Sequence, residues 1–449
     1  MFRSRSVKAS LTALLTAFVM TGCSIGINVD TMLIPPKLSA QQEQIYQALK
    51  NSTGGDIRLK YPKRGAYLSA FIIADIDGDA EDEAIVFYER NTLSTADAGL
   101  RISVLDCIGG EWQSRCDRSA EGSEIEKVVL SPLGESDRMN VIVGYSTANQ
   151  SEKHLCVYNY LNTDDEGKLE QSFQPHSYAM FDVADTGSTH PDLIVLGAAN
   201  ASEQTAYAAV YRLESDDRYH EYKYHFKDSY TDFNQLIYGR LPDGSVAIYV
   251  DAATGTSNMQ TEVLSMEDTR LANVLERCKR VTGEPFRAED TVRRAGLPCT
   301  DIDSDGVPEI PVQNVFLGYE ESAESEQIRQ TRWLMLAEPR IFAEYYSFYN
   351  AGDGYTFLLP ESWQNHVTVV RDASEGEFRI VAYNGEWTDD MPVLMRIYMA
   401  YDDADTDEHL AKGYALMHTK GTARCLVKAE EGQDLSLTIG KLLPCFRFL

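Results

Sequence analysis

One arrangement recurs along most of the chain: an apolar strand, a polar turn, and a second apolar strand. Five such units start near Asp75, Ser131, Asp182, Arg240 and Asp301, at intervals of 56, 51, 58 and 61 residues. Further strand-like segments lie between them, among them RISVLDC, KHLCVYNYL, AYAAVYRL and RWLMLAEP. Four short strands in each unit of roughly 50–60 residues is typical of a β-propeller blade.

The repeat predicts a mainly β fold, with a β-propeller-like domain of about five recognisable blades followed by a small α+β domain. The hydrophobic fraction of 43% is that of a folded globular protein, and the 25 tyrosines favour strands. The alternative is a β-sandwich or an irregular β-rich domain in which the regular spacing has no structural meaning.

Two of the five turns carry carboxylates in the same pattern, at positions 1, 3, 5 and 9. In the first turn, DIDGDAEDE, these residues are Asp75, Asp77, Asp79 and Glu83. In the fifth turn, DIDSDGVPE, they are Asp301, Asp303, Asp305 and Glu309. Crowded carboxylates repel one another, whereas calcium binds about six to eight oxygens at roughly 2.3–2.6 Å. We therefore expect a structural calcium ion at each turn, with the backbone carbonyl of Glu81 or Val307 as a further ligand.

The residues that follow the acidic turns indicate which type of calcium loop they could form. An EF-hand needs a bidentate glutamate at position 12, where this chain has Val86 and Val312 inside apolar strands. The third turn keeps Asp182, Asp185 and Asp192 at an altered spacing, and the second and fourth turns lack the acids. The alternative to a metal site is a solvated turn, because Asp and Gly are good turn formers without any ion.

A nine-residue acidic loop between two strands resembles the FG-GAP/VCBS repeat of integrin-α-type propellers and many bacterial surface proteins. The resemblance covers five units across residues 60–350, and only the first and fifth carry the full D-x-D-x-D-x-x-x-[DE] pattern. It implies calcium-binding propeller blades. Five units are fewer than the seven blades of the integrin type, so the resemblance leaves ring closure open.

The first 23 residues differ from the rest. Three basic residues precede the apolar run LTALLTAFVM, which is typical of a secretory signal peptide. The sequence MTGC that ends at Cys23 resembles the bacterial lipobox, in which the cysteine becomes the lipidated first residue of the mature protein. We expect a lipid anchor at Cys23 and an extracytoplasmic location at a bacterial cell membrane; the alternative is ordinary signal cleavage nearby.

The sequence divides into five expected segments. They are a signal peptide (1–22), a tether (23–38), a short helix (39–52), the propeller-like domain (53–350) and a C-terminal α+β domain (351–449). Ser39 and Gln42 fit a capping box at the start of the helix, and Ile45 and Leu49 lie on one of its faces. The acidic run at 401–409 is interpreted as a solvated loop and helix N-cap, with a cation site as the alternative.

Charge and cysteine content narrow the classes of partner. The formal net charge of −28 repels nucleic acid and favours cations, so nucleic-acid binding is not expected. The seven cysteines after Cys23 show no metal-type CxxC spacing. We consider Cys107 with Cys116, and Cys425 with Cys445, as candidate disulfides, and favour reduced cysteines.

The sequence contains no HExxH, GxSxG, Walker or dinucleotide motif, and its eight histidines are scattered. We expect a protein without enzymatic activity that binds protein or glycan partners or acts as a scaffold. One alternative is a cell-surface polysaccharide hydrolase or lyase. Another is an accessory component of an envelope assembly that contacts its partners through the C-terminal domain. The aromatic run EYYSFYN (344–350) is expected to pack between the two domains, with a carbohydrate platform as the alternative.

Overall fold

The structure is a computed structural model, and seven segments of it are described. They are residues 38–90, 99–135, 137–147, 152–163, 166–200, 203–388 and 390–449. The predicted signal peptide, the predicted lipidation site Cys23 and nearly all of the predicted tether lie outside them. Within the described residues, no helix combines the length and the apolar character that crossing a membrane requires.

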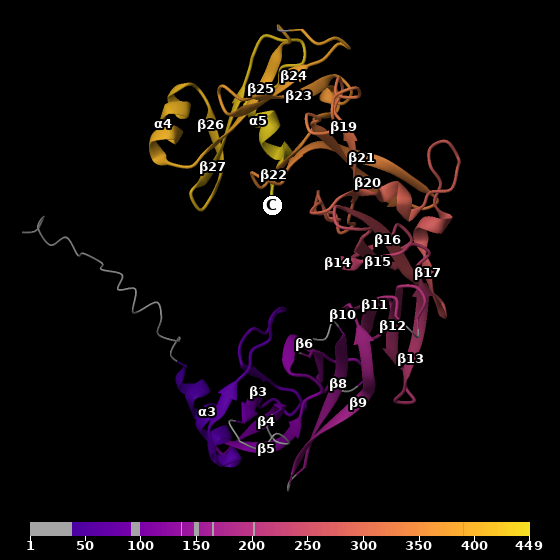
Figure 1. The fold of residues 1–449 in the computed structure, drawn as a ribbon, viewed down its shortest axis with the longest axis vertical. Helices are drawn as coiled ribbons and strands as arrows, with labels where there is room; N and C mark the ends of the chain where they lie inside the picture. Colours follow the sequence, from indigo (N-terminus) through magenta and orange to yellow (C-terminus); the bar gives the residue numbers. More distant parts are fainter. Residues whose placement is uncertain are drawn as a thin grey trace, which may run out of the picture.

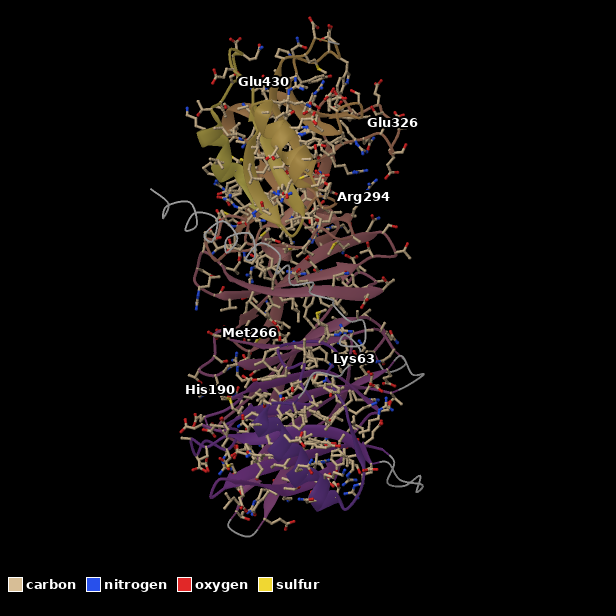
Figure 2. All side chains as sticks on the ribbon, turned by 90° about the vertical axis from the view of Figure 1, so that its left-hand side faces the viewer. Lys63, His190, Met266, Arg294, Glu326 and Glu430 are labelled. Carbon is tan, nitrogen blue, oxygen red and sulfur yellow. The ribbon has the colours of Figure 1, made fainter. Side chains whose placement is uncertain are left out.

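The fold is mainly β, as the repeat predicts. Within the described residues the strands form six antiparallel sheets, and none of these sheets closes into a barrel. Successive sheets follow one another around an open arc, with the N-terminal helix at one end and the C-terminal sheet at the other (Figure 1). The perpendicular view shows the same succession along the long axis, from the sheets near Lys63 to the region of Glu430 (Figure 2).

Helix α3 (Ala40–Thr53) covers the outer face of the first sheet. It begins with the expected capping box: Ser39 Oγ accepts a hydrogen bond from Gln42 N, and Gln42 Oε1 accepts one from Ser39 N, each at 3.1 Å. Ile45 and Leu49 are fully buried against the first sheet, so the helix shields an apolar face that no other sheet covers.

The first and second sheets are each built from strands that are consecutive in the chain. The first sheet has the order β1-β3-β4-β5, and β2 also pairs with β3. Its strands are β1 (Ile57–Leu59), β2 (Phe71–Ala74), β3 (Glu83–Arg90), β4 (Leu100–Ile108) and β5 (Glu111–Ser119). The second sheet contains β6 (Glu124–Ser131), β7 (Asn140–Ser146), β8 (Lys153–Asn162) and β9 (Gly167–Tyr178).

The third and fourth sheets repeat this order. The third contains β10 (Met180–Ala184), β11 (Asp192–Gly197), β12 (Tyr207–Leu213) and β13 (Tyr219–His225). The fourth contains β14 (Asp232–Arg240), β15 (Val246–Ala253), β16 (Asn258–Glu267) and β17 (Arg270–Asn273), and β18 (Arg293–Arg294) pairs with β16. Two short 3-10 helices lie between β17 and β18: η1 (Val274–Arg277) and η2 (Ala288–Thr291).

The fifth and sixth sheets complete the chain. The fifth contains β19 (Ile310–Val315), β20 (Arg329–Ala337), β21 (Arg340–Asn350), β22 (Tyr355–Leu358) and the C-terminal β28 (Phe446–Phe448). The sixth contains β23 (Val367–Asp372), β24 (Glu377–Ala382), β25 (Val393–Ala400), β26 (Ala415–Lys420) and β27 (Ala423–Ala429). Helix α4 (Asp403–Ala411) joins β25 to β26, and η3 (Glu361–Trp363), α5 (Ile439–Leu442) and η4 (Leu443–Cys445) complete the segment. Sheet five thus contains strands from both sides of the expected boundary at 350/351.

Apolar side chains join each sheet to the next. In β7, for example, Val141, Val143 and Tyr145 pack on the first sheet, whereas Ile142 packs on the third. Successive side chains of a strand point to opposite faces, so a strand between two sheets must be apolar on both. This explains why β3, β7, β11 and β15, the second strands in the order of the first four sheets, are each apolar over consecutive residues.

The structure tests three local predictions, which concern the cysteines, the acidic run at 401–409 and the aromatic run at 344–350. All seven cysteines of the described residues are free, as we favoured, and Cys107 lies opposite Trp112 rather than Cys116. The run at 401–409 starts α4, and the side chain of Asp402 caps it by accepting from Asp405 N at 2.8 Å. In the aromatic run, Phe348 packs between the fifth and sixth sheets, as expected of a packing residue.

Two acidic loops as candidate metal sites

The two acidic turns occupy the same place in their sheets. Loop L1 (residues 75–82) follows β2 and leads into β3, and Ala74 pairs with Glu83 across the hairpin. Loop L5 (residues 301–308) leads towards β19, and Thr300 pairs with Glu309 in the same way. Position 9 of each loop pattern is therefore held at the base of a hairpin, on the second strand or directly before it.

The two loops also share a backbone conformation. Positions 4 and 6 are left-handed in both: Gly78 and Ala80 in L1 have φ of 83° and 72°, and Ser304 and Gly306 in L5 have φ of 67° and 91°. Glycine stands at position 4 in L1 and at position 6 in L5, yet the backbone conformation is the same in both loops. Keeping a non-glycine residue in this region costs about 1 kcal/mol or more, so the surrounding contacts must hold it there.

Position 1 fixes this conformation through backbone hydrogen bonds. In L1, Asp75 Oδ1 accepts from Gly78 N at 2.7 Å, and Asp75 Oδ2 accepts from Ala80 N at 2.9 Å. In L5, Asp301 accepts from Asp305 N at 3.0 Å and from Gly306 N at 2.9 Å. Each loop is thereby wrapped around its first carboxylate.

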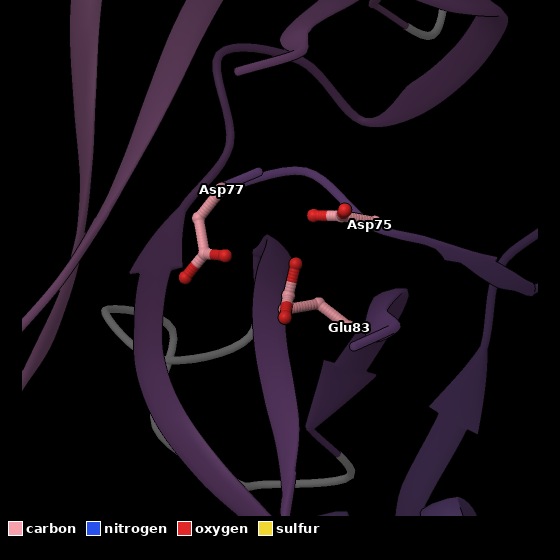
Figure 3. Close-up of side chains that lie close together, drawn as sticks. All are labelled: Asp75, Asp77 and Glu83. Atoms are coloured by element: carbon pink, nitrogen blue, oxygen red, sulfur yellow. The ribbon is translucent and has the colours of Figure 1, made fainter. Parts of the chain in front are cut away.

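Three carboxylates converge in each loop. Asp75, Asp77 and Glu83 each offer an oxygen, and these oxygens all lie within 4.8 Å of one another. Figure 3 shows the three side chains turned towards a common centre. The corresponding group in L5 is Asp301, Asp303 and Glu309. Positions 1, 3 and 9 of the predicted pattern are thus brought together twice.

The glutamate at position 9 is the unusual member of each group. Glu83 and Glu309 are both 0% exposed. One oxygen of each accepts a backbone hydrogen bond at 2.8 Å, from Ile76 N and Ile302 N respectively. The other oxygen, Oε1, is buried and has no hydrogen-bond partner within the described residues. A buried acceptor without a partner is costly unless another group satisfies it.

The electrostatics of both loops favour a cation. Burial raises the pKa of Glu83 to about 7; the hydrogen bond from Ile76 opposes this, and the charges of Asp77, Asp106 and Asp79 add to it. Burial likewise raises the pKa of Glu309 to about 8, with further contributions from Asp303, Asp305 and Asp301. A bound divalent cation would reverse this balance by stabilising the ionised form.

Positions 5 and 7 of the predicted ligand set lie outside the two convergent groups. Asp79 Oδ1 accepts from Glu81 N at 2.8 Å, and Asp305 Oδ1 accepts from Val307 N at 2.7 Å. These contacts tighten the end of each loop. The assignment of Asp79, Asp305 and the carbonyls of Glu81 and Val307 as ligands stays a prediction.

In the third turn a basic side chain lies beside the buried carboxyl group. Asp192, the first residue of β11, is 1% exposed, and Arg212 Nη2 lies 2.9 Å from its Oδ2. The hydroxyl of Thr186 donates to the same oxygen. Asp182 instead contacts Lys127 Nζ at 2.8 Å, and Asp185 accepts from Gly187 N. The three acids of this turn are therefore not brought together, and the guanidinium of Arg212 supplies the positive charge beside Asp192.

The second and fourth sheets need no cation at this position. Asn140 begins β7, and its Oδ1 accepts from Leu133 N at 2.9 Å, which reproduces the glutamate contact without a charge. Val246 begins β15 and is apolar. A buried carboxyl group at the base of the hairpin therefore occurs in three sheets, and in two of these neither lysine nor arginine is paired with it among the described residues.

A separate buried glutamate lines a cavity of about 500 Å³ beside the fourth sheet. Glu262 of β16 accepts hydrogen bonds from the hydroxyl of Tyr230 and the amide of Asn273. Burial raises its pKa to about 7, and Asp228 and Glu276 line the same cavity. This group could not be predicted from the sequence, because its members come from separate segments of the chain.

Comparison with protein-family models and with the sequences of curated proteins gives no match for this chain.

Proposed function

We propose that this chain is an extracytoplasmic protein that uses a calcium-stabilised, propeller-like array of sheets as a binding or scaffold module. In this proposal the array is anchored to a bacterial membrane through a lipid on Cys23, and it presents its surfaces to protein or glycan partners. Calcium has a structural role at L1 and L5.

The observation that carries the proposal is the buried, unpartnered Oε1 of Glu83 and of Glu309. Each lies beside two aspartates that add negative charge, and among the described residues neither glutamate has a basic partner like Arg212. A hard divalent cation that binds carboxylate oxygens accounts for both features at both loops. The stacking of the first five sheets, one for each unit of the sequence repeat, supports the propeller-like arrangement.

Thermal unfolding tests the calcium role directly. Residues 24–449, which include every described residue, are unfolded with calcium, with magnesium and with a chelator. Calcium at a hundredfold excess over its dissociation constant is expected to stabilise the fold by about 2.7 kcal/mol. Asp77→Ala and Asp303→Ala should each reduce this gain, and magnesium should give less of it.

The outcome that would contradict the calcium role is equally direct. If the melting temperature is the same in calcium and in chelator, L1 and L5 are solvated turns. Asp216→Ala serves as the matched control, because Asp216 lies in the exposed turn between β12 and β13, away from both loops. It should leave the calcium effect unchanged.

The anchor is tested separately. The full chain should fractionate with membranes, and Cys23→Ser should release it. If the Cys23→Ser variant stays with the membrane fraction, another segment anchors the protein.

A polysaccharide hydrolase is the second candidate function, because Glu262 lies in a cavity with a pKa near neutrality, as a general acid requires. Both its oxygens, however, accept hydrogen bonds from the protein itself. Activity on a panel of polysaccharides that is lost in Glu262→Gln, with calcium-dependent stability unchanged, would establish the enzyme.

A further inference from the structure

Strand β28 joins three parts of the molecule. It pairs with β22 at the edge of the fifth sheet, although the whole sixth sheet lies between these two strands in the chain. The ring of Phe448 stacks on His418 of the sixth sheet, with ring centroids 3.9 Å apart. Arg447 reaches L5, where its Nε donates to the carbonyl oxygen of Ile302 at 2.9 Å. A strand of three residues therefore contacts the fifth sheet, the sixth sheet and an acidic loop.

Ile302 is position 2 of L5, and both of its backbone polar groups are engaged. Its N–H donates to the buried carboxylate of Glu309 at 2.8 Å, and its carbonyl oxygen accepts from Arg447. The residues on either side of it in the chain, Asp301 and Asp303, are the other two members of the convergent carboxylate group. One residue therefore connects all three carboxylates of L5 to β28.

Position 2 of L1 makes the same two kinds of connection. The N–H of Ile76 donates to Glu83 at 2.8 Å, and its carbonyl oxygen accepts from the N–H of Met139 at 3.1 Å. Met139 lies directly before β7 of the second sheet. In both loops the buried glutamate is thus linked, through position 2, to a segment outside the hairpin of the loop. That segment is the next sheet for L1, and it is β28 for L5.

The position of Ile302 depends on whether the carboxylates around it are held together. Oxygens of Asp301, Asp303 and Glu309 lie within 4.8 Å of one another, so the ionised groups repel when no cation lies between them. A cation that binds all three draws positions 1, 3 and 9 together and fixes position 2 between them. A hydrogen bond weakens steeply when its distance and angle change, so the contact from Arg447 is strongest when Ile302 is fixed.

We propose that L5 is a calcium-controlled clasp for β28: the occupied loop holds the strand on the fifth sheet through Ile302 and Arg447, and the empty loop lets the strand fray. The inference rests on the proposed calcium role of L5 and adds a regulatory consequence to it. Because β28 also contacts the sixth sheet, loss of calcium loosens the connection between the fifth and sixth sheets. L1 makes its contact with the second sheet and has no such effect on β28.

Hydrogen exchange of residues 24–449, followed by mass spectrometry of the peptide that covers β28, tests the clasp. Calcium at a hundredfold excess over its dissociation constant should slow exchange in this peptide by up to about 100-fold, the limit for full coupling between the ion and the strand. Asp303→Asn should remove this protection, because it disables L5. Asp77→Asn is the matched change in L1, and it should leave the protection of β28 in place.

Arg447→Gln tests the contact itself. It removes the guanidinium that donates to Ile302, so β28 should exchange faster than in the parent when calcium is present. Coupling between two sites is reciprocal, so the variant should also weaken calcium binding at L5 by about fivefold or more. Isothermal titration of the D75N/D77N protein, in which L1 is disabled, measures this loss. Arg371→Gln, the same change at an exposed position of β23, is the control and should change neither value.

The inference is overturned if calcium raises the melting temperature but leaves the exchange of β28 unchanged. It is also overturned if Asp77→Asn removes the protection of β28 as completely as Asp303→Asn does, because the effect would then be global. In both cases calcium still stabilises the fold, so the proposed function survives. If calcium changes neither the melting temperature nor the exchange, the proposed function and the inference fail together.

Discussion

Glu83 and Glu309 combine three properties that rarely occur together in a carboxylate: full burial, one satisfied oxygen and one oxygen without a partner in the part of the chain that the structure describes. A neutral side chain would be cheaper to bury, as Asn140 shows at the equivalent place. Retaining the charge twice, in loops of the same backbone conformation, is explained if a cation completes each group.

The first prediction concerns that charge. Glu309→Gln keeps an acceptor for Ile302 N but removes the buried negative charge beside Asp301 and Asp303. Without calcium, at a pH above the pKa of about 8 of Glu309, the variant should be more stable than the parent by about 1–3 kcal/mol, because an unsatisfied buried charge is lost. With calcium it should lose the stabilisation that L5 gives.

Urea denaturation with calcium and with a chelator measures both effects. Glu361→Gln, at an exposed position in η3, is the control and should change neither value. A variant that is less stable than the parent in chelator would show that the ionised Glu309 is already satisfied without metal.

The second prediction is a pH dependence. The folded-state pKa values of about 7 for Glu83 and about 8 for Glu309 exceed the ordinary value of 4.5, so the folded protein binds more protons than the unfolded chain between these limits. Stability without metal should therefore fall as pH rises from about 5 to 8. Calcium affinity should rise over the same range, because metal and proton compete for the same oxygens.

Melting temperatures in chelator and calcium titrations at pH 5.5, 6.5 and 8 measure the two trends. Glu309→Gln should reduce the pH dependence of the melting temperature in chelator and that of the calcium affinity. A metal-free protein that becomes more stable from pH 5.5 to 8 would contradict the assignment of the two glutamates as the groups that titrate.

At the scale of the hairpin, the residue at the start of the second strand differs in chemistry between the sheets. Glu83 and Glu309 lie in carboxylate clusters that could hold a metal ion, Asp192 pairs with Arg212, Asn140 is neutral and Val246 is apolar. The hairpin itself persists through all of them, because the strands on either side are held by the adjacent sheets. The loop residues can therefore change their chemistry without changing the fold.

The third prediction tests the internal cation. Arg212→Gln leaves the buried carboxyl group of Asp192 without its guanidinium partner, which should destabilise the protein by about 3 kcal/mol. Calcium should not restore this loss, because Asp182 and Asp185 do not converge with Asp192. Adding Asp192→Asn should restore most of the stability. Urea denaturation with and without calcium measures all three proteins, and full rescue of Arg212→Gln by calcium would show that the third turn is a suppressed metal site.

The elements themselves could be predicted from the sequence to a large extent. The apolar runs and acidic spacing predicted the strand–turn–strand units, the helix at 39–52 and the convergence of Asp75, Asp77 and Glu83, because these depend on neighbours in the chain. The pairing of Arg212 with Asp192 could not be found, because it depends on cross-strand register.

At the scale of the whole molecule, the sheets form a linear succession in which apolar cores join neighbours: first to second, second to third, and so on to the sixth. Helix α3 closes one end, and α4 packs on the sixth sheet near the other. Stability in such an array is close to a sum of each unit and its interfaces. Because α3 covers the first sheet and α4 packs on the sixth, these end sheets are covered without packing against each other.

The last prediction follows from this nearest-neighbour construction. L1 and L5 lie near opposite ends of the array, so calcium at each should protect the sheets beside it more than distant ones. Hydrogen exchange followed by mass spectrometry is expected to show calcium-dependent protection centred on β2–β3 and on β19–β20. Asp77→Asn should remove the first protection and Asp303→Asn the second, while the third sheet, held by Arg212 and Asp192, should change little in either variant. If one substitution removes protection from every sheet, the array unfolds as a single cooperative unit and the ions stabilise the whole molecule rather than its two ends.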